Sequence, residues 1–169
     1  MERLWAPWRA KYISKVLGKK HKGCLFCRIV KSKADAKNFV FIRGRLVYAV
    51  LNIYPYSNGH CLVLPNRHTG DISTMTKAEL AEMMEVMLET KALLQEALSP
   101  QGFNVGFNLG RIAGAGIPGH VHMHIVPRWR SDHNFMPVTA QTKVISQSLN
   151  VIYKLLTNAH KNRHRRTRS

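Results

Sequence analysis

The sequence predicts a single α+β domain in which helices pack on one face of an antiparallel sheet. Short apolar segments that are joined by short turns indicate strands that pair as hairpins. Two longer segments with apolar residues at helical spacing indicate amphipathic helices that cover the sheet. The chain has 169 residues, of which 45% are hydrophobic, so it is long and apolar enough to bury a sizeable core.

Five segments have the apolar character and the flanking turn residues of strands. We expect these strands at residues 39–43, 46–51, 60–65, 102–108 and 120–127. The first two form a hairpin around the turn Arg43-Gly44-Arg45. The stretch that follows Ile29, up to about residue 37, is mostly polar, and we expect it to form a linker.

Two segments have the pattern of helices. Thr76 and Glu79 have the spacing of a capping box and begin a helix that we expect to end near Leu98. A second amphipathic helix is expected over residues 142–156, where apolar residues recur every three or four positions. Its apolar face points to the same core as that of the first helix.

The composition of the two ends sets them apart from the rest of the chain. Residues 1–22 form a basic arm that contains Trp5 and Trp8, and two large apolar rings are expected to dock on a surface. Residues 23–157 form the main domain. Residues 158–169 form a basic tail that is predicted to be disordered.

The formal net charge of +17 points to partners that are rich in phosphate, either nucleotides or nucleic acid bound through the basic termini. A solvated basic surface without such a partner is the alternative. No apolar segment is long enough to span a membrane, and the first residues lack the apolar core of a signal peptide. We therefore expect a cytoplasmic protein without a membrane partner.

The segment from Gly119 to Arg128 carries the strongest chemical signal. Three histidines alternate with three apolar residues, so on a strand the histidines share one face and the apolar residues share the other. The histidines are His120, His122 and His124, and the apolar residues are Val121, Met123 and Ile125. Buried imidazoles are costly without a partner, which makes the histidine face a candidate site.

Three interpretations of this face compete. A single zinc ion bound by all three rings conflicts with strand geometry, because His120 and His124 would lie about 13 Å apart while Zn–N bonds are about 2.1 Å. A polar strand face without a function leaves the sustained alternation unexplained. Phosphate chemistry uses all three residues, since a neutral imidazole can attack a phosphoryl group while its neighbours donate to phosphate oxygens or to the leaving group.

The loop before this segment is rich in glycine. Residues 110–119 contain four glycines, so their backbone can approach a ligand closely. The spacing is not that of a Walker-type phosphate loop. The loop therefore supports a ligand site without identifying the ligand.

The cysteines indicate a reducing compartment. Cys24 and Cys27 form a Cys-x-x-Cys pair that could supply half of a tetrahedral zinc site, form a redox pair, or remain two free thiols. The pair lacks the strand-then-helix context of a thioredoxin-like motif. Cys61 lies in an apolar run and is expected to be an inert buried thiol.

The segment His120-Val121-His122-Met123-His124-Ile125-Val126-Pro127-Arg128 resembles the signature of the histidine triad (HIT) nucleotide-binding family. The segment from Ala113 to His120, the start Leu4-Trp5-Ala6-Pro7-Trp8-Arg9 and Trp129 are similar to the family's diadenosine polyphosphate phosphorylase-like branch. The resemblance covers about residues 4–157. It implies a five-stranded antiparallel sheet with two main helices packed on it, and a homodimer whose sheets join.

The resemblance also implies an enzyme, a nucleotidyl transferase or hydrolase that cleaves dinucleoside polyphosphates or related nucleotide conjugates at the α-phosphate. The expected substrate is an adenine nucleotide, and the acceptor is phosphate or water. His122 would be the nucleophile that forms a nucleotidyl-histidine intermediate, and His124 would contact the phosphate or the leaving-group oxygen. The expected nucleotide-binding residues are Asn52, His60, Asn108, Gly116, Ile117 and Gly119.

Zinc-bearing members of the family imply a structural zinc ion that the chemistry itself does not need. Its ligands would be Cys24, Cys27, His68 and His120. Many members have a glutamine or serine just before the triad, whereas this chain has Ile117-Pro118-Gly119 there. That glutamine or serine contacts the phosphates or the leaving group, and backbone N–H groups are expected to make this contact instead.

A second class of function is a protein that binds nucleic acid or senses nucleotides on the same fold. The net charge and the basic tail favour it. Removal of adenylate from nucleic-acid ends would combine the two classes.

Overall fold

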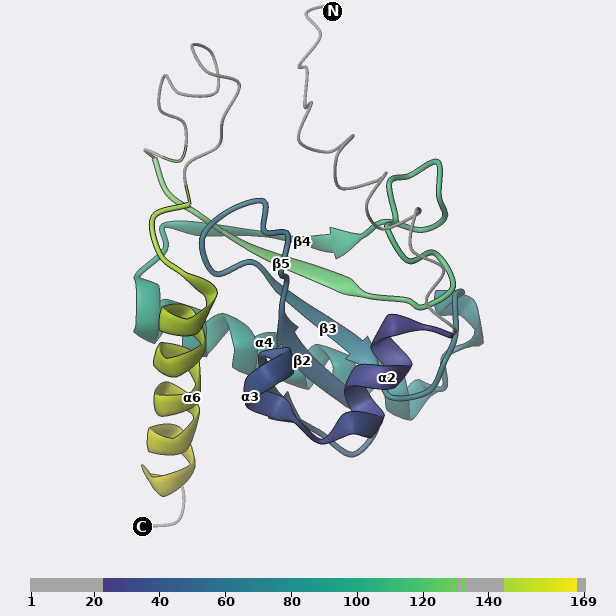
Figure 1. Cartoon of the computed structure of the whole chain (residues 1–169), viewed down its shortest axis with the longest axis horizontal. Coiled ribbons are helices and arrows are strands. Elements are labelled where there is room, and N and C mark those ends of the chain that lie inside the picture. The colour runs from purple at the N-terminus through teal and green to yellow at the C-terminus, as the bar shows by residue number, and fades with distance from the viewer. Residues whose placement is uncertain (1–22, 131, 133–144, 167–169) are drawn as a thin grey trace, which may run out of the picture.

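A computed structural model describes residues 23–130, 132 and 145–166 (Figure 1). The expected N-terminal arm lies outside the described residues, as do residues 142–144 at the expected start of the second long helix. Among the residues that are described, no helix is long and apolar enough to cross a membrane.

The centre of the fold is a five-stranded antiparallel sheet, as expected, and its strand order is β1-β2-β3-β5-β4. Its strands are β1 (Val40–Arg43), β2 (Val47–Leu51), β3 (Cys61–Pro65), β4 (Gly102–Phe107) and β5 (Met123–Arg128). β2 and β3 are buried along their whole length, whereas β4 lies at an edge and is partly exposed. The centre of the sheet therefore belongs to the core of the fold.

Two long helices cover one face of the sheet. α4 (Lys77–Leu98) begins with the expected capping box, in which Thr76 and Glu79 each bond to the other's backbone N–H. α6 (Leu149–Arg166) packs beside α4 and against β1. Apolar side chains of both helices fill the main core together with those of the strands; among them are Met83, Leu93, Ile152, Leu156 and Ile125.

The C-terminal helix differs from its expected bounds. It begins at Leu149 rather than at residue 142, and it continues to Arg166. The prediction that the tail is disordered from residue 158 is therefore wrong as far as Arg166. Apolar contacts with the core continue through Ala159, and positively charged side chains are favourable near the C-terminus of a helix.

Two short helices lie on the other face of the sheet, in front of it in Figure 1. α2 (Leu25–Ser32) and α3 (Asp35–Asn38) replace the expected linker, so the helices are not confined to one face. α2 is amphipathic, because Phe26, Ile29 and Val30 recur at helical spacing and pack against the β2 and β3 side chains of this face. Its eight residues are too few for the apolar pattern to predict a helix.

A single 3-10 turn, η1 (Ile72–Thr74), precedes α4. The Arg67 guanidinium forms an ion pair with Glu79 at 2.9 Å and also donates to the Thr74 carbonyl oxygen. These contacts attach the segment that follows β3 to the start of α4.

Candidate active site

The histidine-rich segment enters the sheet later than expected. β5 begins at Met123, so His120 and His122 precede the strand, and the His120 N–H donates to the Ile117 carbonyl oxygen in a turn. The alternation of faces is nevertheless present, because Val121, Met123 and Ile125 are buried in the core beneath α4 and α6. The histidine side chains therefore face the opposite side of the sheet, where α2 lies.

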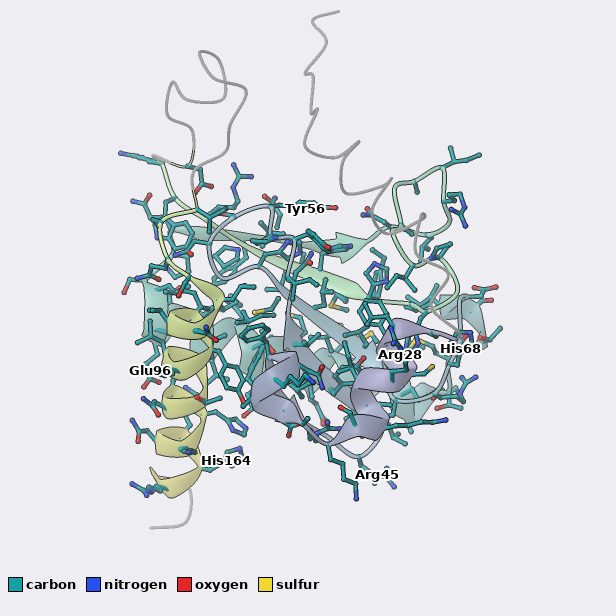
Figure 2. All side chains as sticks on the ribbon, in the orientation of Figure 1. Arg28, Arg45, Tyr56, His68, Glu96 and His164 are labelled. Atoms are coloured by element: carbon teal, nitrogen blue, oxygen red, sulfur yellow. The ribbon has the colours of Figure 1, made fainter. Side chains whose placement is uncertain are left out.

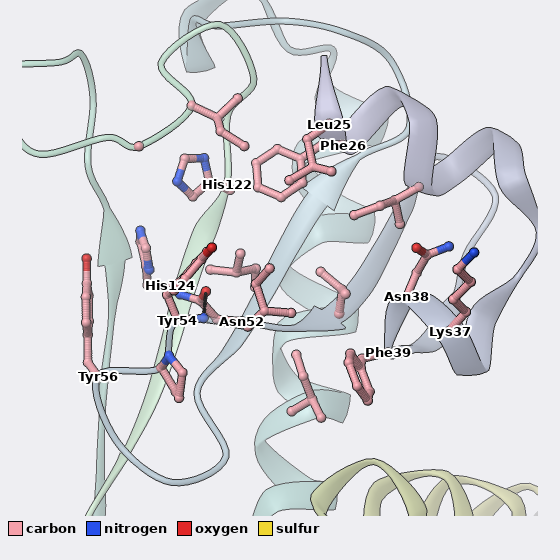
Figure 3. Close-up of a pocket in the computed structure, with 18 of the residues that line it drawn as sticks. Leu25, Phe26, Lys37, Asn38, Phe39, Asn52, Tyr54, Tyr56, His122 and His124 are labelled. Carbon is pink, nitrogen blue, oxygen red and sulfur yellow. Dashed lines mark hydrogen bonds between the residues drawn. The ribbon is translucent and has the colours of Figure 1, made fainter. Parts of the chain in front are cut away.

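A cavity of about 460 Å³ opens on the α2 side of the sheet. In Figure 3 the imidazoles of His122 and His124 lie on one side of it, with Leu25 and Phe26 of α2 next to His122. Lys37, Asn38 and Phe39 lie on the opposite side. Five of the sequence-predicted site residues line it, namely Asn52, Gly116, Ile117, His122 and His124. Such a cavity suits a ligand with one apolar ring system and one polar end.

His122 has one ring nitrogen bound and the other available. Its Nδ1 lies 2.8 Å from the His120 carbonyl oxygen, which can only accept, so Nδ1 carries the proton and Nε2 has the lone pair. The Phe26 ring packs against His122 with centroids 5.3 Å apart. Burial lowers the pKa of His122 below its usual value of 6.5, so the ring stays neutral.

His60 sets the tautomer of His124. The Tyr56 backbone N–H donates to His60 Nδ1 at 3.0 Å, so a neutral His60 carries its proton on Nε2. His60 Nε2 then donates to His124 Nδ1 at 2.9 Å. The His124 proton therefore lies on Nε2.

Two asparagines flank this pair of rings. Asn52 Nδ2 lies 3.3 Å from His60 Nδ1, and the Asn52 Oδ1 atom accepts from the Tyr54 N–H. The Asn108 amide lies 3.4 Å from His124 Nε2, and it can accept the proton there by presenting its oxygen. The structure thus brings Asn52, His60 and Asn108 around His124, although neither His60 nor Asn108 lines the cavity.

The glycine-rich loop closes one side of the cavity. Gly116 and Ile117 line the cavity, whereas Gly119 lies next to the His68 ring, where an added Cβ would be 3.8 Å from two ring atoms. Gly114 has a φ of 93°, a backbone conformation that side chains other than that of glycine rarely adopt. The loop therefore runs between the cavity and the cluster that contains His68.

Two aromatic residues of the site were missed from the sequence. Tyr56 stacks on His124 with an interplanar angle of 15°, and Phe26 contacts both His120 and His122. The only signal for Tyr56 was its place in the aromatic loop Tyr54-Pro55-Tyr56 after a strand. Phe26 gave no signal, because its contacts depend on a helix that was not expected.

The four expected zinc ligands come together at the N-terminus of α2. Cys24, Cys27, His68 and His120 each present one ligand atom, and all four atoms lie within 4.8 Å of one another. Cys27 Sγ is 3.3 Å from His68 Nδ1 and 3.6 Å from His120 Nδ1, and Cys24 Sγ is 3.5 Å from His120 Nδ1. Segments from three parts of the chain thus meet at this cluster.

These separations fit tetrahedral coordination. Zn–S bonds of about 2.3 Å and Zn–N bonds of about 2.05 Å at a tetrahedral angle place S and N about 3.6 Å apart. His120 Nε2 donates to the Pro65 carbonyl oxygen at 2.9 Å, which leaves the Nδ1 lone pair directed at the cluster. The donor set and the orientation of His120 are therefore compatible with tetrahedral zinc coordination.

The fold, the histidine pair in the cavity and the glycine-rich loop define a protein of the histidine triad class. The HIT domain profile matches residues 33–131. The chain belongs to the HIT family, as the resemblance in its sequence indicated.

The most informative relatives are enzymes by name. The AP-4-A phosphorylase of Mycobacterium tuberculosis (strain ATCC 25618 / H37Rv) is 37% identical over 161 residues, which cover 92% of this chain and 83% of that protein. The asymmetrical bis(5'-nucleosyl)-tetraphosphatase of Schizosaccharomyces pombe is 33% identical over 101 residues, which cover 60% of this chain and 55% of that protein. Similarity to the phosphorylase thus extends over nearly the whole chain.

A solved structure has the same fold. It is a Zn-bound histidine triad family protein from Mycobacterium smegmatis, with a TM-score of 0.69 and 26% identity. The match covers 84% of this chain and 96% of that one. The zinc ion is bound by the M. smegmatis protein.

Proposed function

We propose that this protein transfers a nucleotidyl group from a dinucleoside polyphosphate, such as diadenosine tetraphosphate, to phosphate or water. The observation that carries the proposal is the pair of rings at the cavity: His122 has a lone pair on Nε2, and His124 has a proton on Nε2. The ring centroids lie 5.0 Å apart, so a nucleophile and a hydrogen-bond donor stand side by side. The names of the two relatives support the same class of substrate.

The reaction has two steps. In the first, His122 Nε2 attacks the α-phosphorus, a P–N bond forms, and the P–O bond to the remaining polyphosphate breaks. The departing oxygen leaves as part of a polyphosphate anion, and the His124 Nε2–H donates a hydrogen bond to it. In the second step, a phosphate anion or water attacks the phosphorus and the P–N bond breaks, which releases the nucleotide and restores neutral His122. Where water attacks, its proton passes to solvent.

The lining of the cavity suggests how the substrate is held. The adenine ring would pack against apolar lining residues such as Leu25, Phe39 and Ile117. Asn52 would bind the ribose hydroxyls, and the backbone of Gly116 to Gly119 would contact the phosphates. His60 and Asn108 would act through His124, because their contacts fix the position and tautomer of that ring.

We also infer that Cys24, Cys27, His68 and His120 hold a structural zinc ion. Zinc would supply no chemistry to the reaction. It would tie α2, which walls the cavity, to the segment just before His122. The separations of the ligand atoms and the zinc in the M. smegmatis relative support this proposal.

A homodimer is the proposed assembly. β4 is an edge strand, and three consecutive residues at its centre, from Asn104 to Gly106, are exposed. Val105 has 46% of its surface exposed. An exposed edge strand with an apolar residue can pair with the same strand of a second copy, which would extend the sheet.

Product analysis tests the proposed reaction. The protein would be incubated with diadenosine tetraphosphate with and without inorganic phosphate, and the nucleotides would be separated by ion-exchange chromatography. ATP with ADP that appears only when phosphate is present indicates phosphorolysis, and ATP with AMP indicates hydrolysis. An absence of cleavage in both conditions by the folded protein would overturn the proposal.

Binding of nucleic acid is a second candidate function. The last turns of α6 carry Lys161, Arg163 and Arg165, and all three are exposed. Replacing all three by glutamine should weaken the binding of single-stranded RNA and reduce its dependence on salt. Diadenosine tetraphosphate cleavage by that variant should not change.

A further inference from the structure

A second group of metal-ligating side chains lies between the two long helices. His160 and His164 are one helical turn apart on α6, and Glu89 faces them from α4. The group lies apart from the Cys/His cluster: Figure 2 shows His164 near the end of α6 and His68 on the far side of the molecule. Neither the proposed reaction nor the structural zinc site uses these three residues.

The three ligand atoms converge. His160 Nε2 and His164 Nε2 are 2.9 Å apart, and Glu89 Oε1 lies 3.2 Å from the first and 3.4 Å from the second. Atoms bound to one ion at about 2.1 Å are about 3.0 Å apart at a right angle and about 3.4 Å apart at a tetrahedral angle. The observed triangle spans this range, so an ion can sit within bonding distance of all three atoms.

The helix geometry produces this convergence. Residues four apart lie on the same helix face, and the face that carries Ile152 and Leu156 is buried against the core. His160 and His164 continue the same series toward the C-terminus, where Glu89 stands on the adjoining helix. The packing of α6 therefore aims both imidazoles at the carboxylate.

The donor set identifies the kind of ligand. Two imidazoles and one carboxylate suit divalent transition-metal ions, and a set of three protein ligands leaves positions for water. The side chains are accessible to an ion from solvent, with exposed fractions of 29% for Glu89, 25% for His160 and 57% for His164. Exposed sites with few protein ligands exchange their metal, unlike a closed site with four.

We propose that Glu89, His160 and His164 bind a divalent transition-metal ion, such as Zn²⁺, which ties the C-terminal part of α6 to α4. The ion links two helices that otherwise contact each other mainly through apolar side chains. When the ion is bound, the last turns of α6 open less often. The site is independent of the cavity on the opposite face of the sheet.

Metal binding by tag-free protein tests the site. Zn²⁺ uptake would be measured by isothermal titration at neutral pH in the wild type and in the His164→Ala and Glu89→Gln variants. Asn162→Ala is the matched control, because Asn162 is an exposed neighbour on the same helix. Cys27→Ser removes one ligand of the Cys/His cluster, so it distinguishes Zn²⁺ binding at the two sites.

The wild type should show a binding event that persists in Cys27→Ser and Asn162→Ala. His164→Ala and Glu89→Gln should each weaken that event at least about tenfold, since even loss of a group that only supports a metal ligand costs 10- to 100-fold. Hydrogen exchange of residues 158–166 should slow on addition of Zn²⁺ in the wild type and not in His164→Ala. Zn²⁺ binding that is equal in all variants, or exchange that Zn²⁺ does not change in the wild type, would overturn the proposal.

Discussion

The His60 Nε2 atom lies 2.9 Å from His124 Nδ1, and this contact determines which nitrogen of His124 faces the substrate. His60 is itself oriented by the Tyr56 backbone N–H, and its side chain is almost completely buried. His60 does not line the cavity, yet it orients the His124 Nε2–H that donates to the leaving group. His60 is a positioning residue in this account.

Replacement of His60 tests that role. His60→Leu should lower kcat by about 10- to 100-fold with little change in KM, because His124 loses the partner that holds its tautomer. His60→Gln keeps an N–H donor and should recover part of the lost kcat. The measurement is steady-state cleavage of diadenosine tetraphosphate, with thermal unfolding as a check of the fold. If both variants lost the same activity, the tautomer argument would fail.

Zinc content tests the Cys/His cluster. The wild type should retain zinc after extensive dialysis, whereas Cys27→Ser should retain much less and unfold at a lower temperature, because binding of metal to the folded state is a source of stability. Cys61→Ser is the matched control, since Cys61 is buried away from the cluster. Elemental analysis by mass spectrometry measures the zinc. Equal zinc retention in Cys27→Ser and the wild type would contradict the site.

The ion pair between Arg67 and Glu79 predicts a dependence of stability on pH. The Arg67 guanidinium lowers the pKa of Glu79 from its ordinary value of 4.5 to about 2. The carboxylate therefore stabilises the fold fully above about pH 5, and this contribution is lost as the pH falls toward 2. Glu79→Gln should lower the free energy of unfolding by about 1–2 kcal/mol at pH 7, because Arg67 is half exposed and solvent weakens the pair.

Urea unfolding at pH 7 and pH 3 measures this contribution. The gap between the wild type and Glu79→Gln should narrow by more than half at pH 3. Asp35→Asn removes the more exposed pair with Arg43 and should cost less than about 1 kcal/mol. A gap that is the same at both pH values would contradict a stabilising role of the ionised Glu79 carboxylate.

The exposed edge of β4 predicts the assembly. Val105→Lys should convert the proposed dimer to a monomer, because pairing would place two ammonium groups in a strand interface. Light scattering after size-exclusion chromatography measures the mass in solution. A wild type that is monomeric, or a Val105→Lys variant that remains dimeric, would contradict pairing through this strand.

The sequence predicted the sheet and the chemical centre of the site, because both depend on local patterns. Alternation placed Val121, Met123 and Ile125 in the core, and the capping box located the start of α4. α2 was missed because its apolar contacts occupy only eight residues, and Phe26 was missed with it. The convergence of Glu89 with His160 depends on the packing of α4 against α6, which no local pattern reveals.

The central claim is that His122 forms a covalent bond to the nucleotide. Rapid acid-free denaturation of the protein during turnover of diadenosine tetraphosphate, followed by intact-mass and peptide mass spectrometry, tests it most directly. We expect a population heavier by one adenylate group, with the adduct on the peptide that contains His122, and no adduct or turnover in His122→Ala. Undiminished turnover in His122→Ala, or an adduct on another residue, would contradict it.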